Sequence, residues 1–107
     1  MPTGTTDELI DMRTLEEVAP VIRNAAHPLR LRILDFLRLE GGPRTVTEIT
    51  EAGGASQAVI SQQLRILKDQ GIVTARREGN HVLYDVANRN VLLLLECIRR
   101  HKEGGCV

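Results

Sequence analysis

The sequence predicts a mainly α fold with a β-hairpin wing, in the order α-α-α-α-β-β-α. Three observations support this fold. Apolar residues recur at helical spacing in five stretches, a glycine-rich turn separates two short helices, and one alternating segment near the end folds back on itself. The 107 residues are enough for one domain, and one Phe, one Tyr and no Trp leave an aliphatic core that suits packed helices.

The first two predicted helices lie on either side of a boundary at His27 and Pro28. The pattern is helical over residues 7–26, with Pro20 expected to break or kink the helix or to mark a new start near Leu15. A second helix begins at Pro28, because the residue before a proline avoids helical geometry, and ends at residues 41–43, Gly-Gly-Pro. Its apolar stripe consists of Leu29, Ile33, Phe36 and Leu37.

Two further helices form a predicted helix-turn-helix. A short helix runs from Thr45 to Ala52, and Glu48 stands in capping-box spacing to Thr45. A Gly-Gly-Ala turn follows, and Ser56 caps the next helix, which ends before Gly71. The inward stripe of this last helix is Ile60, Leu64 and Leu67.

The remaining elements are a hairpin and a final helix. Residues 72–77 and 81–86 alternate as strands around a Glu-Gly-Asn turn, which makes the fold a winged helix-turn-helix. A last helix covers residues 88–102 and is apolar nearly all round between Val91 and Leu95. Such a helix is normally covered by its own domain and by a partner.

The exposed face of the helix after Ser56 is the predicted reading surface for DNA. Glutamine pairs with adenine, serine fits several bases, and arginine suits guanine or phosphate. The first-turn N–H groups beside Ser56 also favour a phosphate. The alternative is a polar face that is merely solvated. The residues expected to face outward are Gln57, Ala58, Ser61, Gln62 and Arg65, and the predicted DNA contacts are Ser56, Gln57, Ser61, Gln62 and Arg65.

The charge distribution adds a basic wing. Net charge is zero, but residues 1–20 carry five acidic side chains and one arginine, whereas residues 56–89 carry five cations and three acids. Cations at a wing tip commonly touch phosphate or the minor groove. The alternative is a solvated strand end. The predicted wing contacts are Arg76, Arg77, Asn80 and His81.

The chain resembles the ArsR/SmtB family of winged-helix repressors from about Leu15 to His101. The resemblance rests on HPLRLRILDFL, VTEIT, SQAVISQQLRILKDQGIV and RREGNHVLYDV. It implies a homodimer joined by the first and last helices, a pseudo-palindromic DNA operator, and release by an inducer. Gln63 departs from the family, which often has histidine there, and we include Gln63 among the expected DNA contacts.

Two sensor sites known in the family lack their ligands. Residues 46–49 are Val-Thr-Glu-Ile where a soft-metal site needs cysteines. The positions matching a zinc site on the last helix are Asn88, Asn90, His101 and Gly104, of which His101 alone is a strong ligand.

A third sensor set remains near the C-terminus. Cys97 and His101 are four residues apart on one helix face, and Cys106 follows on a Gly-Gly tail. These residues are candidates for a thiophilic metal, arsenite or a disulfide switch. The alternative is that Cys97 is a small buried hydrophobe and Cys106 a tail thiol. No other cofactor is predicted.

Several classes of protein are excluded. Two late cysteines argue against a disulfide scaffold, and there is neither an apolar signal segment nor a membrane-length apolar run, so we expect a cytoplasmic protein. There is no phosphate-binding loop and no catalytic constellation, so no enzyme is predicted. We expect residues 1–6 to be disordered, 7–103 to form the dimerising domain, and 104–107 to be flexible. The alternative functions are a protein-interaction module and a constitutive regulator.

Overall fold

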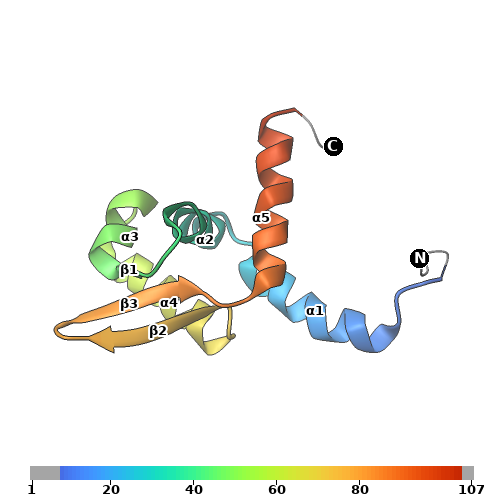
Figure 1. The fold of residues 1–107 in the computed structure, drawn as a ribbon, viewed down its shortest axis with the longest axis horizontal. Helices are drawn as coiled ribbons and strands as arrows, with labels where there is room; N and C mark the ends of the chain where they lie inside the picture. Colours follow the sequence, from blue (N-terminus) through green and yellow to red (C-terminus); the bar gives the residue numbers. More distant parts are fainter. Residues whose placement is uncertain (1–7, 105–107) are drawn as a thin grey trace.

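A computed structural model describes residues 8–104, so the expectations for residues 1–6 and for Cys106 lie outside the described part. The predicted helix and hairpin order is confirmed there. The helices are α1 (Met12–Ala25), α2 (Pro28–Glu40), α3 (Val46–Gly53), α4 (Gln57–Asp69) and α5 (Arg89–Lys102), and the strands are β1 (Arg44–Thr45), β2 (Val73–Glu78) and β3 (His81–Val86). In Figure 1, α2, α3, α4 and the hairpin form the body, α5 stands across it, and α1 projects away.

Helix α1 differs from its prediction at both its start and its middle. It begins at Met12 and not at residue 7, because the Asp11 side chain caps it by accepting from the Thr14 backbone N–H at 3.0 Å. Hydrogen bonds from the Thr14 backbone N–H and the Thr14 hydroxyl hold the pKa of Asp11 below its usual value. The helix is continuous through Pro20, so the expected break or new start is wrong. Pro20 lies on an exposed stretch, where water can satisfy the carbonyl group left without an N–H donor.

The core is aliphatic, as predicted, and every helix contributes to it. The helix-turn-helix packs on α2. Full burial of each leucine, isoleucine or valine side chain in this core stabilises the fold by about 1.5–3 kcal/mol. The buried set is Ala25, Ile33, Leu34, Leu37, Ile49, Ile60, Leu64, Leu67, Ile72, Val73, Val91 and Leu95.

The hairpin is part of a three-stranded antiparallel sheet with the order β1-β3-β2. Its register runs from Val73 opposite Val86 to Glu78 opposite His81, and Gly79 takes the positive φ of 63° that the two-residue turn requires. Strand β1, which was not predicted, pairs Arg44 with Tyr84. A strand of two residues is too short to show an alternating pattern in the sequence. The wing is therefore joined to the segment that leads into α3.

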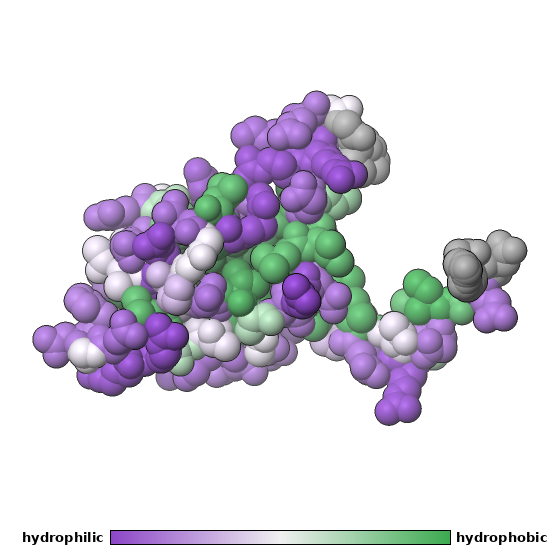
Figure 2. Space-filling view, in the orientation of Figure 1, coloured by the Kyte–Doolittle hydropathy of each residue, from purple (hydrophilic) through white to green (hydrophobic). Residues whose placement is uncertain are grey.

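Apolar side chains remain exposed on α1, on the segment before it, and on α5. Leu93 in the apolar run of α5 is 71% exposed, while Val91 and Leu95 are buried. Figure 2 shows apolar surface over the α1–α5 junction and again on the projecting arm. Within residues 8–104, no helix has the length and apolar character needed to cross a membrane.

Candidate nucleic-acid interface

Helix α4 has one fully buried face and one open polar face. Ile60, Leu64 and Leu67 are each 0% exposed, which fixes the helix on the core. The opposite face carries the predicted reading set in the open, with Gln57, Ala58, Ser61, Gln62 and Arg65 all exposed. The predicted orientation of this helix is confirmed.

The start of α4 is set by a sharp turn and a cap. Gly54 follows α3 with a φ of 76°, a left-handed conformation that favours glycine. Ser56 then caps α4, its Oγ accepting from the Val59 backbone N–H at 3.3 Å. The remaining first-turn N–H groups point along the helix axis, where an anion is favoured.

Gln63 is directed away from the open face. It is half-buried, and its Oε1 accepts from the Nε of Arg30 at 2.6 Å. Arg30 also donates to the carbonyl oxygen of Asn24 at 3.0 Å, and the Asn24 side chain donates to Gln70 at 3.1 Å. The structure thus joins α1, α2 and α4 through one guanidinium group. Because Arg30 and Gln63 are 33 residues apart, no local pattern in the sequence indicates this contact.

The wing tip presents its predicted residues to solvent. Arg76, Arg77, Asn80 and His81 are all exposed. Arg76 forms an ion pair with Glu78 at 3.2 Å, whereas the neighbouring Arg77 points to the other face of the strand. The two arginines therefore face different directions.

The predicted capping box at the start of α3 is present and supports the turn. The Thr45 N–H donates to the Glu48 carboxylate at 2.9 Å, and the Glu48 N–H donates to the Thr45 hydroxyl at 3.3 Å. The hydrogen bond from the Thr45 backbone is the main reason that the pKa of Glu48 lies below its usual value, and the charges of Arg44 and His81 lower this pKa further.

The candidate sensor residues on α5 lie at the surface. Cys97 and His101 are both exposed, so Cys97 is not the buried hydrophobe of the alternative interpretation. Among residues 8–104, no three His, Cys, Asp or Glu side chains are grouped to hold a metal ion. Cys106, the third member of the predicted set, lies beyond this range.

Comparison with known proteins assigns the family. The model of the family described as "Bacterial regulatory protein, arsR family" matches residues 27–75. The transcriptional regulator NmtR of Mycobacterium tuberculosis is 36% identical over 94 residues, which cover 88% of this chain and 77% of NmtR. The chain belongs to the ArsR family.

Solved structures support the same assignment for this ArsR-family chain. The antimony-specific transcriptional repressor AntR has a TM-score of 0.77 at 32% identity, covering 91% of this chain and 89% of AntR. The homodimeric winged helix-turn-helix domain of Mb0332 from Mycobacterium bovis has a TM-score of 0.68 at 33% identity, covering 95% and 91%. These comparisons confirm the predicted family and the predicted winged-helix fold. They also confirm that the family's role is DNA-binding transcriptional regulation, as predicted, and not enzymatic catalysis.

Proposed function

We propose that this ArsR-family chain binds its operator as a homodimer, with α4 in the major groove. The observation that carries the proposal is the division of α4 into a fully buried face and an open polar face. On the open face, short and amide-bearing side chains allow close approach and pairing with base edges. The proposed contacts on this helix are Ser56, Gln57, Ser61, Gln62 and Arg65.

The wing supplies contacts beside the helix. Arg77, Asn80 and His81 are exposed at the hairpin tip and are suited to phosphate or the minor groove. Arg76 can join them by exchanging its exposed ion pair with Glu78 for a phosphate. An exposed pair of this kind contributes little to stability, so the exchange costs little.

Gln63 has a different role in this proposal. Its side-chain oxygen is occupied by Arg30, and it is half-buried between α4 and α2. We assign it to holding α4 in position and not to contacting bases.

The homodimer is supported by apolar surface on the first and last helices. Leu15 and Ile22 on α1 and Leu93 and Ile98 on α5 are 40–71% exposed. Burial of such side chains in an interface is favourable, and the similar Mb0332 domain is homodimeric. Two-fold symmetry would place two copies of α4 about 34 Å apart, one turn of DNA.

We further propose that the chain is a repressor and that a small inducer releases it from its operator. The similar protein AntR is an antimony-specific repressor, and a probable mercury resistance operon repressor of Streptomyces lividans is 36% identical over 86 residues. For this chain the candidate sensor is Cys97 with His101 and Cys106, for arsenite, a thiophilic metal or a redox signal. Exposure of Cys97 and His101 one turn apart supports access by such an inducer.

Fluorescence anisotropy on DNA fragments from the chromosomal neighbourhood of the gene tests the DNA-binding part. We expect one fragment to bind much more tightly than the others, with affinity falling steeply as salt rises. Lack of binding to every fragment at any salt would contradict the proposal and favour the protein-interaction module.

A further inference from the structure

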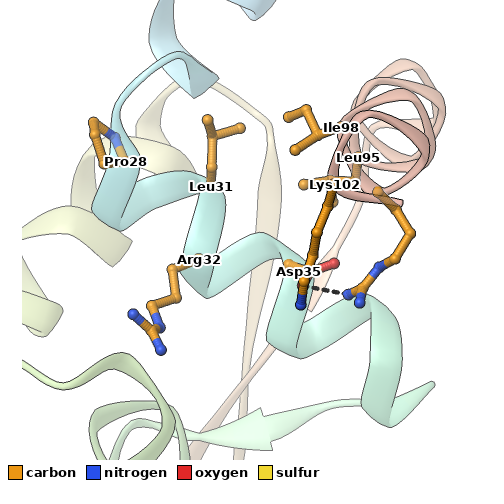
Figure 3. Close-up of a pocket in the computed structure, with 8 residues that line it drawn as sticks. Pro28, Leu31, Arg32, Asp35, Leu95, Ile98 and Lys102 are labelled. Atoms are coloured by element: carbon orange, nitrogen blue, oxygen red, sulfur yellow. Dashed lines mark hydrogen bonds and ion pairs between the residues drawn. The ribbon is translucent and has the colours of Figure 1, made fainter. Parts of the chain in front are cut away.

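A cavity of about 350 Å³ opens between α2 and the C-terminal half of α5. Its floor is apolar, and Leu31 of α2 and Ile98 of α5 point toward one another across it (Figure 3). Arg32 and Lys102 line its edges. The cavity is therefore apolar within and basic at its rim.

The acidic residue of this cavity is already neutralised. Asp35 accepts from Arg99 at 2.8 Å and from Arg38 at 3.0 Å, so two guanidinium groups share its charge. Among the described residues, Arg32 and Lys102 take part in no ion pair. The rim is thus suited to an acidic group.

The segment before α1 has the complementary character. Leu9 is 97% exposed and Ile10 62%, and Glu8 precedes them. Burial of these two adjacent apolar side chains in an interface would be favourable. Since Asp11 is occupied in capping α1, Glu8 is the carboxylate within residues 8–11 that is available to a basic partner.

This segment cannot reach the cavity of its own protomer. Helix α1 joins the body through Val21 and Ala25 near its C-terminal end, and its start points outward (Figure 1). The 14 residues of α1 hold the segment about 20 Å from that junction. Helix α5 also has 14 residues, so an α1 that lay antiparallel along a partner's α5 would bring the segment before α1 to the C-terminal end of that α5, beside the cavity.

We propose that the α2–α5 cavity receives residues 8–11 of a second copy of this chain. Leu9 and Ile10 would fill the apolar floor, and Glu8 would face Lys102. By two-fold symmetry each protomer donates one segment and accepts one. The proposal rests on the proposed homodimer and extends it to α2, which packs directly on the helix-turn-helix.

Disulfide trapping tests the docking in the full chain with Cys97→Ser and Cys106→Ser. Protomers carrying Leu9→Cys are mixed with larger, tagged protomers carrying Lys102→Cys and are oxidised mildly. We expect a covalent heterodimer, because a disulfide forms only between closely placed residues. Glu51→Cys, exposed on α3 and far from the cavity, is the matched control. Equal trapping by Lys102→Cys and Glu51→Cys would overturn the docking.

Charge exchange gives a second readout. Glu8→Lys and Lys102→Glu should each raise the Kd of the dimer about two- to fivefold, and the double variant should recover most of this loss. Glu51→Lys should change nothing. Sedimentation of the unmodified chain separates the two hypotheses. A monomer would contradict the homodimer itself, whereas a dimer without selective trapping or charge coupling would contradict only the docking.

Discussion

Arg30 Nε donates a hydrogen bond to Gln63 Oε1 at 2.6 Å, across 33 residues of sequence. The same guanidinium group donates to the Asn24 carbonyl at 3.0 Å, and the Asn24 amide reaches Gln70 at 3.1 Å. Arg30 of α2 therefore links the end of α1 to the middle of α4, and the Asn24 side chain of α1 contacts the C-cap residue of α4 directly. The orientation of the open polar face of α4 depends on these hydrogen bonds as well as on apolar packing.

A charge substitution on α4 should separate positioning from DNA contact. We expect Gln63→Glu to keep operator affinity within about threefold, because a carboxylate can accept a stronger, charge-assisted bond from Arg30. Gln62→Glu, one residue earlier on the open face, should weaken binding about tenfold or more by facing phosphates. Anisotropy titration with circular dichroism as the folding control measures both. Equal losses from the two variants would show that Gln63 faces the DNA.

Truncation of the open face should weaken DNA binding without unfolding the domain. Gln62→Ala should cost about 1–3 kcal/mol on the specific operator if it pairs with a base. Arg65→Ala should reduce the slope of log affinity against log salt by about one if it neutralises a phosphate. Arg13→Ala removes a similar exposed cation on α1 and serves as the control. Unchanged affinity in both α4 variants would disprove the assignment of this face.

The capping box should make stability depend on pH through Glu48. Because the folded pKa of Glu48 is lowered, its contribution is present above the unfolded pKa of about 4.3 and is lost as pH falls through the folded value. Urea unfolding of the wild type and of Glu48→Gln should therefore show stabilities that converge as the pH falls from about 4.3 through the lower, folded pKa of Glu48. A difference that is constant from pH 7 to pH 3 would mean that ionisation of Glu48 makes no contribution.

If Cys97 and Cys106 form the proposed sensor, their substitution should abolish the response to the inducer. The reduced protein bound to its operator is titrated with arsenite, zinc or peroxide, and release is followed by anisotropy. We expect one of these agents to release wild-type protein and Cys97→Ser with Cys106→Ser to stay bound, because thiolates are the soft ligands and the redox groups of the set. Release of both proteins alike would exclude the thiols and favour another effector or a constitutive regulator.

Local patterns predicted the helix-turn-helix and the hairpin well. Ser56, the stripe from Ile60 to Leu67 and the following glycine act within one helix, so the sequence displays them directly. The start of α1 was misplaced because Leu9 fits the helical period, although the Asp11 cap begins the helix later.

Contacts between distant residues were not predictable in the same way. The hydrogen bond between Arg30 and Gln63 and the pairing of β1 with β3 join segments with no shared periodicity. The family resemblance placed Gln63 among the DNA contacts because the family often has histidine at this position. Only the packing of α4 on α2 shows which way Gln63 points.

The two residue pairs that join β1 to β3 limit how far the hairpin can move relative to the helices. A hairpin attached at one end could swing to suit many grooves, whereas Arg44 opposite Tyr84 and Thr45 opposite Leu83 brace it to the root of α3. The distance between the hairpin tip and α4 is then held fixed. If the wing contacts DNA as proposed, a duplex whose minor groove lies at that distance would bind without bending, and any other would have to be deformed to fit. The brace would thus let DNA shape contribute to selection at base pairs that no side chain touches.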